Sequence, residues 1–359
     1  MSENATPSQL ARIHLYADFA LARRTKLKER FVVASISGGK DSSAMSLWLH
    51  EHDVEHARVF CDTGWEHQRT YDYLRGPLTK KLGPIEELRA VVQLSAEERV
   101  AMRQEIDGYP LVIAAFEQEA PMVLLALKKG MFPTAKARWC TEQLKEEPIK
   151  LYLERRIDAE DDVVSAAGIR ADESVTRATY AEWHELRWGR RKEGKLLSYD
   201  CDMWRPLLKW SIDDVVWIHK RHNLEPNPMY LVPGVERVGC GPCIRARKAE
   251  IRATADRFPE RIDLIRELEA CVQRIAAKRL AGQQIKNPHY KPPGWFQGPV
   301  RSDADRGGCW PIDDVVAWSR TKRGGKELEL FAPTESAGCL RWGLCEAPTP
   351  SSNKPESAE

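Results

Sequence analysis

A glycine- and serine-rich turn near the amino end carries the residues best suited to chemistry. It reads Ser37-Gly38-Gly39-Lys40-Asp41-Ser42. Two adjacent glycines let a backbone turn tightly with its N–H groups pointing into the loop, where they attract an anion. Lys40 adds a mobile positive charge, and the serines add hydroxyl donors. The turn is therefore predicted to bind phosphate groups.

Two predicted elements position this turn. The β-branched apolar run at 31–36 is typical of a buried strand, and a helix is predicted from about Asp41. A helix N-terminus behind the turn favours an anion. The sequence lacks the Walker A and G-x-G-x-x-G patterns of other phosphate-binding loops. An ordinary glycine-rich connection is the alternative.

Polar and charged residues follow two further predicted strands. They are Asp62, Thr63 and Gly64 after the strand at 57–61, and Gly168 and Arg170 after the strand at 163–167. Ligands of open parallel sheets bind at the carboxyl ends of strands, so we expect these residues beside the turn. Arg170 is suited to neutralise a phosphate or sulfate, with a surface salt-bridge cluster as the alternative.

Predicted strands and helices alternate through the first part of the chain, with a helix at 68–82 and a strand at 88–92. This alternation predicts an α/β fold with a doubly wound, mostly parallel sheet, followed by a helical, cysteine-rich C-terminal part. We expect a helical lead-in at 1–27, a nucleotide-binding domain at 28–236, a cysteine-rich region at 237–346 and a disordered tail at 347–359.

The amino-acid composition argues against two classes of protein, dedicated nucleic-acid-binding proteins and membrane proteins. The 359 residues are 42% hydrophobic and 30% charged, and the net charge of +2 does not indicate a dedicated nucleic-acid-binding protein. Basic residues nevertheless cluster at 128–156, 187–192 and 245–261, either as anionic-ligand surfaces or as solvated helix faces. No apolar run reaches the length of a membrane span, so we expect a cytoplasmic protein with no membrane partner.

Nine cysteines in a reducing compartment favour metal binding or thiol chemistry over disulfides. Cys240 and Cys243 form a C-x-x-C turn before a predicted basic helix at 244–258. A second pair, Cys339 and Cys345, lies near the end. Two such pairs make a four-thiolate site, which suits either structural zinc or an iron-sulfur cluster.

Cys140 is a candidate metal ligand or reactive thiol. Thr141 is predicted to be the N-cap of a helix ending near 155, which places Cys140 just before a helix N-terminus and close to Arg138. Such surroundings lower the pKa of a thiol and favour the thiolate, although a lone cysteine is more often a buried small side chain. Cys309 is a weaker candidate ligand. Three others are interpreted as buried thiols, namely Cys61, Cys201 and Cys271.

The succession of motifs resembles the phosphoadenosine phosphosulfate (PAPS) reductase family of the PP-loop ATP pyrophosphatase superfamily. The matching segments, within 28–260, are the turn at 37–42, Asp62-Thr-Gly-Trp-Glu66, Arg138-x-Cys140-Thr-x-x-Leu-Lys145 and Gly168-x-Arg170-x-x-Glu173-Ser174. The resemblance implies an adenine nucleotide α-hydrolase fold. It implies that residues 37–42 hold phosphates, that Asp62 and Thr63 flank the nucleotide, and that Arg170 approaches the anionic group.

The resemblance also favours a 4Fe-4S cluster over zinc, because iron-sulfur members place thiolates at the positions of Cys140, Cys240 and Cys243. A cluster bound by Cys240, Cys243, Cys339 and Cys345 leaves Cys140 free for chemistry. An alternative set uses Cys140 in place of one C-terminal thiol.

Two departures from the sulfonucleotide reductases favour ATP with Mg²⁺ over PAPS as the nucleotide. Those enzymes commonly have a degenerate phosphate loop and end in a Glu-Cys-Gly-hydrophobic-His segment. Here the loop is complete, and the C-terminal segment is Cys339-Leu-Arg-Trp-Gly-Leu-Cys345-Glu.

We therefore expect an enzyme that adenylates a substrate for sulfur transfer, with a nucleic acid as one candidate acceptor. Catalysis is expected from Lys40, Asp62, Cys140 and Arg170. One alternative is reductive cleavage of PAPS or adenosine phosphosulfate to sulfite, with thioredoxin or glutathione as reductant. A third hypothesis is a nucleotide-sensing subunit of a modification or defence complex. The acceptor, the sulfur donor and the oligomeric state stay open, a homodimer included.

Overall fold

A computed structural model describes residues 27, 29–282, 292–297, 309–321 and 342. The predicted lead-in up to residue 26, the cysteines Cys339 and Cys345 and the predicted tail lie outside the described residues.

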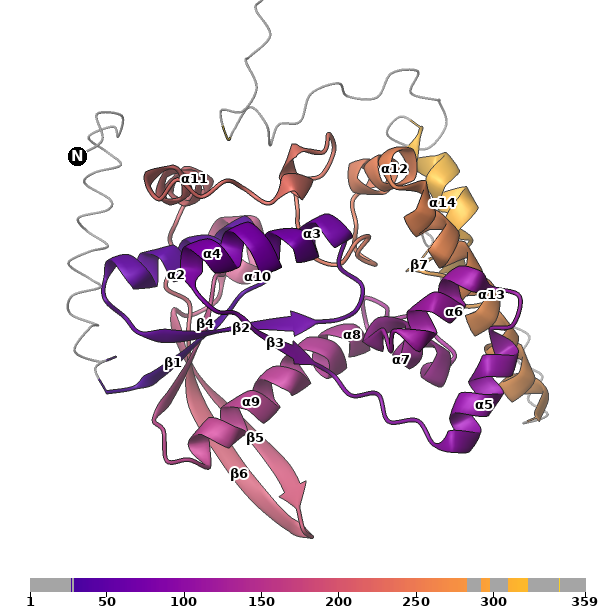
Figure 1. The fold of residues 1–359 in the computed structure, drawn as a ribbon, viewed down its shortest axis with the longest axis horizontal. Helices are drawn as coiled ribbons and strands as arrows, with labels where there is room; N and C mark the ends of the chain where they lie inside the picture. The colour runs from indigo at the N-terminus through magenta and orange to yellow at the C-terminus, as the bar shows by residue number, and fades with distance from the viewer. Residues whose placement is uncertain (1–26, 28, 283–291, 298–308, 322–341, 343–359) are drawn as a thin grey trace, which may run out of the picture.

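Within the described residues, six strands form one sheet in the order β3-β2-β1-β4-β6-β5 (Figure 1). All neighbouring strands are parallel except β5 and β6. The predicted α/β fold with a mostly parallel sheet is therefore confirmed. The strands are β1 (Phe31–Ser35), β2 (His56–Asp62), β3 (Glu86–Arg89), β4 (Val163–Ala167), β5 (Trp183–Lys192) and β6 (Lys195–Trp204).

Helices cover both faces of this sheet, and alternating residues of β1 point to the two layers. Val32 and Ala34 belong to the core under one set of helices, whereas Val33 belongs to the core on the other side. One layer holds α2 (Lys40–Glu51), α3 (Gln68–Tyr73), α4 (Thr79–Leu82) and α11 (Ile212–Arg221), and the other holds α9 (Glu147–Ile157) (Figure 1).

The order of the strands fixes where a ligand can bind. From β1 the chain runs outward through β2 to β3, and it then returns to place β4 on the other side of β1. The carboxyl ends of β1 and β4 therefore form a topological switch point, where open α/β sheets bind ligands.

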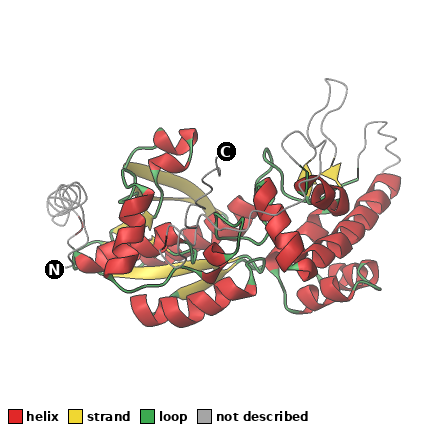
Figure 2. Cartoon of the chain, turned by 90° about the horizontal axis from the view of Figure 1, so that it is seen from above, coloured by secondary structure: helices red, strands yellow, loops and turns green. Residues whose placement is uncertain are grey.

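A second group of helices packs beside the sheet domain around its own core (Figure 2). Two segments far apart in sequence build it, because α13 contacts both α6 and α7. Buried tryptophans and Cys240 join this core to the end of β2. The helices are α5 (Ala96–Glu105), α6 (Pro110–Glu117), α7 (Pro121–Lys129), α12 (Lys248–Arg257), α13 (Pro259–Gly282) and α14 (Ile312–Ser319).

Short elements complete the described chain. They are α8 (Trp139–Thr141), α10 (Val175–Ala178), β7 (Phe296–Gln297), β8 (Cys309–Trp310), π-helical turns at Leu74–Leu78 and Glu142–Glu146, and 3₁₀ turns at Ala171–Glu173 and Pro228–Leu231. Among the described residues, no single helix is long and apolar enough to cross a membrane. Helices α6 and α7 pass that test only together, and they meet at an angle of 111°.

One prediction of local structure is wrong, and a second has displaced bounds. Thr141 is not an N-cap, since α8 begins at Trp139 with Arg138 as its N-cap and runs through a π-helical turn into α9. The strand predicted at 88–92 is β3, shifted towards the amino end. The basic cluster at 187–192 belongs to β5, where Arg190 is paired with Glu154 of α9 and Lys192 with Asp158, the C-cap of that helix.

Candidate nucleotide site and cysteine cluster

The predicted phosphate-binding turn connects β1 to α2, and its backbone requires glycine. Gly38 has a φ of +69°, a conformation that L side chains rarely adopt. A Cβ atom there would also lie 3.1 Å from Leu74 Cγ and 3.2 Å from Thr70 Cγ2. The turn is therefore built on a glycine for both conformational and steric reasons.

Serine hydroxyl groups hold the turn closed. Ser42 Oγ donates to the carbonyl oxygen of Gly39 at 3.0 Å and accepts from the N–H of Ser37 at 3.1 Å. Ser43 Oγ donates to the same Gly39 carbonyl at 3.0 Å. These buried hydroxyls shape the loop before any ligand arrives.

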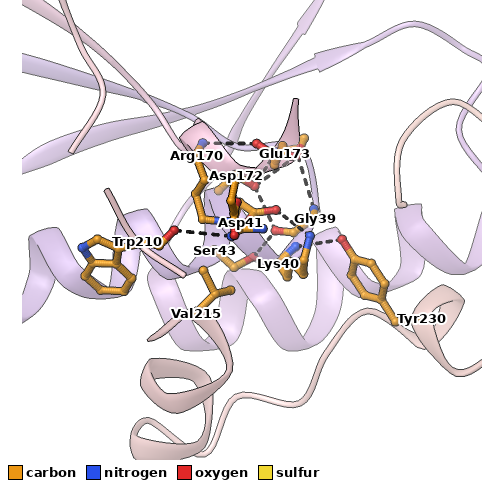
Figure 3. Close-up of polar contacts among 12 residues, drawn as sticks. Gly39, Lys40, Asp41, Ser43, Arg170, Asp172, Glu173, Trp210, Val215 and Tyr230 are labelled. Atoms are coloured by element: carbon orange, nitrogen blue, oxygen red, sulfur yellow. Dashed lines mark hydrogen bonds and ion pairs between the residues drawn. The ribbon is translucent and has the colours of Figure 1, made fainter. Parts of the chain in front are cut away.

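Two cations of the site meet at Asp41 (Figure 3). Lys40 Nζ lies 2.8 Å from one carboxylate oxygen, and Arg170 Nε lies 2.5 Å from the other. Burial alone raises the pKa of Asp41, but the two cations outweigh it and hold that pKa below its ordinary value. Arg170 is only 4% exposed and also pairs with Asp172 at 2.6 Å, so it is not part of a surface salt-bridge cluster.

Gly168 brings the end of β4 against the start of α2. A Cβ atom on Gly168 would lie 2.7 Å from the carbonyl oxygen of Asp41. Backbone cannot yield as a flexible side chain can, so only glycine permits this approach. The close contact places Arg170, two residues later, on the phosphate-binding turn.

The residues after β2 form a tight, buried turn. Asp62 Oδ1 accepts from the N–H of Gly64 at 2.8 Å and from the hydroxyl of Tyr71 at 2.5 Å. Thr63 Oγ1 donates to Glu66 at 2.8 Å. Burial raises the pKa of Tyr71, and the neighbouring carboxylates of Glu66 and Asp62 raise it further. Sequence reasoning missed Tyr71, since its spacing from Asp62 carries no motif.

The C-x-x-C turn lies against the end of β2. Residues Glu66 and Cys240 form an isolated antiparallel β-bridge, and the N–H of Gly241 donates to the carbonyl of Trp65 at 3.0 Å. Cys240 Sγ lies 3.8 Å from a carboxylate oxygen of Glu66. Residues 174 positions apart in the sequence thus meet beside the predicted nucleotide site.

Lys145 is a half-buried cation beside the thiols of Cys240 and Cys243. Its ammonium pKa is raised, above all by the negative charge available at Cys240, and also by Glu66, Cys243 and Cys140. Lys145 is the last residue of the motif that begins at Arg138, but the sequence alone did not indicate a role for it. Its positive charge lowers the pKa values of the Cys140 and Cys240 thiols, but by less than burial raises them.

The prediction of a lowered thiol pKa at Cys140 is wrong. Burial raises the pKa of Cys140, because desolvation outweighs the favourable contributions of Thr141 and Lys145. Burial likewise raises the pKa of the Cys240 thiol to about 12. In the described part of the chain, no three His, Cys, Asp or Glu side chains are arranged to hold one metal ion.

Two cavities meet at this edge of the sheet. One of about 270 Å³ is lined by Lys40, Arg170 and Tyr230 among others. Another of about 180 Å³ is lined by Cys240, Cys243 and Lys145 among others. Val235 and Arg237 line both, so a single segment of chain separates the phosphate-binding turn from the cysteines.

Comparison with known proteins identifies the family. Residues 31–246 match the phosphoadenosine phosphosulfate reductase domain. The chain belongs to the PAPS reductase family. It is therefore a nucleotide-utilising protein of the PP-loop superfamily, whose members bind adenine-nucleotide substrates.

Several known proteins are similar to this chain in sequence. An uncharacterised 37.8 kDa protein of Escherichia phage 186 is 32% identical over 343 residues, which cover 88% of this chain and 96% of that protein. Two uncharacterised proteins of Methanocaldococcus jannaschii are 31% and 29% identical over 37% and 66% of this chain. The matches span only 25% and 46% of those two proteins.

A PAPS reductase from Candida auris is similar among solved structures, with 12% identity and a TM-score of 0.37. The match covers 67% of this chain and 98% of that one. A similarity at this level supports no inference about function.

Proposed function

We propose that this PAPS reductase family member is an ATP-dependent enzyme that adenylates an acceptor for sulfur transfer. The observation that carries the proposal is the complete phosphate-binding turn, with Lys40 and Arg170 brought together on Asp41 at the switch point of the sheet. A degenerate loop would suffice for a reaction that releases no pyrophosphate. The complete loop therefore favours ATP.

In the proposed reaction, an acceptor oxygen attacks the α-phosphorus of ATP. The new O–P bond forms as the bond from the α-phosphorus to the bridging oxygen breaks, and pyrophosphate leaves. Hydrosulfide then attacks the activated acceptor, and a bond from the acceptor to sulfur forms as the bond from the acceptor to the AMP oxygen breaks and AMP leaves. Mg²⁺ enters with ATP as part of the substrate.

The chain's own residues contribute positioning and charge neutralisation. The first N–H groups of α2 are proposed to bind the phosphates, and Lys40 and Arg170 supply two positive charges beside the start of that helix. Such chemistry depends on holding the reacting groups in line and needs no protein nucleophile. Asp62, predicted to flank the nucleotide, has both its carboxylate oxygens engaged by neighbours in the described residues, so we assign it the shaping of the turn.

The cysteines are proposed to form the sulfur or electron site. Cys240, Cys243 and Lys145 line one cavity, and Cys140 interacts electrostatically with both Cys243 and Lys145, which supports a shared thiol site there. The described residues alone do not complete a four-thiolate site, so no step of the proposed reaction uses an iron-sulfur cluster. When bound, such a cluster supplies electrons or handles sulfur.

Product analysis tests the proposal. Purified protein given ATP, Mg²⁺ and sulfide should release pyrophosphate in the presence of the acceptor, for which DNA and RNA are the first candidates. Lys40→Ala should lower that release at least 100-fold, because a charge that stabilises the transferring phosphates is lost. Lys195→Ala, at the exposed tip of the β5–β6 hairpin, is the matched control and should not change it.

A second candidate function is favoured by the family itself, whose name denotes sulfonucleotide reduction. Sulfite release from PAPS or adenosine phosphosulfate with thioredoxin or glutathione, without pyrophosphate release from ATP, would replace the proposal by that reaction. Binding of ATP with neither product would indicate the nucleotide-sensing role.

A further inference from the structure

A tyrosine hydroxyl is hydrogen-bonded to the phosphate-binding turn itself. The N–H of Lys40 donates to Tyr230 Oη at 3.1 Å (Figure 3). Lys40 is the first residue of α2, so its N–H is one of the donors that have no partner within the helix. A phosphate at this helix start would be expected to use the same N–H.

The turn that carries Tyr230 is fastened to the loop at a second point. Tyr230 lies in the 3₁₀ turn Pro228–Leu231, which begins after Asn227. Asn227 Nδ2 donates to the carbonyl of Gly38 at 3.0 Å, and its Oδ1 accepts from the N–H of Met229. Asn227 therefore positions the 3₁₀ turn, and this turn carries Tyr230 to the N–H of Lys40.

The hydroxyl fills space directly in front of the loop. A Cβ atom on Gly39 would lie 3.4 Å from Tyr230 Oη and 3.2 Å from Ser37 Oγ. Tyr230 is 4% exposed, and Lys40 Nζ lies 5.6 Å from the centroid of its ring. A phosphate oxygen that accepts from the Lys40 N–H would need the position that the hydroxyl now holds.

The hydroxyl is uncharged, which makes it a weak competitor. Burial raises the pKa of Tyr230, so the phenol keeps its proton at neutral pH. A charged phosphate oxygen is a stronger acceptor for the same N–H than a neutral hydroxyl. Exchange of one for the other is therefore favourable only for an anionic ligand.

We propose that Tyr230 is a positioning residue that occupies the anion position of the phosphate-binding turn until a phosphate oxygen of the nucleotide displaces its hydroxyl. The inference rests on the proposed function and adds a basis for selectivity to it. Polyphosphates displace the hydroxyl, whereas a nucleoside without phosphate leaves it in place. Before nucleotide binds, the hydroxyl also gives the Lys40 N–H a hydrogen-bond acceptor.

Calorimetric titration of inorganic pyrophosphate into wild type and Tyr230→Phe tests this exchange. The variant should bind pyrophosphate about two- to tenfold more tightly, the factor that corresponds to one hydrogen bond no longer broken on binding. Adenosine should bind wild type and variant equally. Tyr230→Met, which also lacks the hydroxyl, should change affinity for pyrophosphate in the same direction.

Tyr199→Phe is the matched control. Tyr199 is 3% exposed, and its hydroxyl bonds to Lys192 and Asp158 in the hairpin region, away from the loop. The Tyr199→Phe variant should bind pyrophosphate with the same affinity as wild type. Thermal melting should show that each variant is folded.

The outcomes separate the inference from the proposed function. Unchanged or weaker pyrophosphate binding by folded Tyr230→Phe would overturn the displacement while leaving the nucleotide site intact. Wild-type protein that binds neither pyrophosphate nor ATP would overturn the proposed function, and the inference with it.

Discussion

At the scale of single residues, Asp41 is the anion that both cations of the phosphate-binding turn share. Its side chain is 13% exposed, and it holds Lys40 and Arg170 on opposite carboxylate oxygens. A nucleotide polyphosphate would offer those cations further negative charge, so Asp41 keeps them in place until a ligand arrives. This pre-organisation is the kind that favours phosphoryl transfer.

Removal of the Asp41 charge should therefore destabilise the chain. We expect Asp41→Asn to lower the free energy of unfolding by ~3 kcal/mol, because Arg170 loses a buried partner. Since the cations lower the pKa of Asp41, its contribution is present above the ordinary carboxyl pKa and is lost as the pH falls through the folded-state value. Urea denaturation at pH 7 and at acid pH measures both effects.

Asp172→Asn is the control for that change. Asp172 pairs with the same guanidinium but is 48% exposed, so its loss should cost less than about 1 kcal/mol. Equal effects of the two substitutions would show that the position of Asp41 between the cations is unimportant.

At the scale of elements, local signals predicted the parts of the site that lie next to strands. The buried runs of β1, β2 and β4 are each followed by the polar residues expected at a ligand-binding edge. Helices α11 and α14 begin at Ile212 and Ile312, where paired acids follow Ser211 and Pro311 and suit the positive end of a helix.

Contacts between segments that are far apart in the sequence could not be predicted from the sequence. Tyr230 and Lys40 are 190 residues apart, and no spacing rule joins them. The hairpin β5–β6 was interpreted only as a basic cluster, because its charges obscure the alternation of a strand. Helices α5 to α7 were missed because their partner, α13, lies far along the chain.

Glu269 on α13 holds two other segments of the helical part in place through hydrogen bonds. It accepts the backbone N–H of Trp295 at 2.8 Å and of Ile312, at the start of α14, at 3.0 Å. Burial nevertheless raises its pKa from 4.5 to about 7. The folded chain therefore binds a proton here more tightly than the unfolded chain does.

This shift predicts a pH dependence of stability. The contribution of Glu269 is fully present below pH ~4.5 and is lost as the pH rises through about 7, a total of ~3 kcal/mol. Glu269→Gln cannot ionise, so its stability relative to wild type should increase between pH 5 and pH 8. Parallel urea-denaturation midpoints for the two proteins across that range would contradict the assignment.

At the scale of the whole molecule, the C-x-x-C turn at 240–243 lies where the sheet domain and the helical part meet. Cys140 and Cys240 pack against the core of the helical part, while Glu66 and Lys145 reach the same place from the sheet side. Occupation of this centre by a metal would therefore tie the two parts together. Metal content and global stability should change together.

Metal analysis of anaerobically purified protein tests that expectation and the choice of ligands. We expect iron and acid-labile sulfide in preference to zinc. Cys240→Ser should lose the metal and lower the melting temperature, because two thiols of the C-x-x-C turn act as one clamp. Cys201→Ser, at a buried thiol of the sheet with its pKa raised to about 11, is the control and should keep the metal.

Two further variants distinguish between the two possible sets of metal ligands. Loss of the metal in Cys339→Ser but not in Cys140→Ser would support the set of Cys240, Cys243, Cys339 and Cys345, and would leave Cys140 free to act on sulfur. Loss in Cys140→Ser would assign that thiol to the centre, where the positive charge of Lys145 offsets part of the effect of burial on its pKa. Protein that contains zinc alone would assign the cysteines a structural role, and sulfur transfer would then require a thiol outside the metal centre.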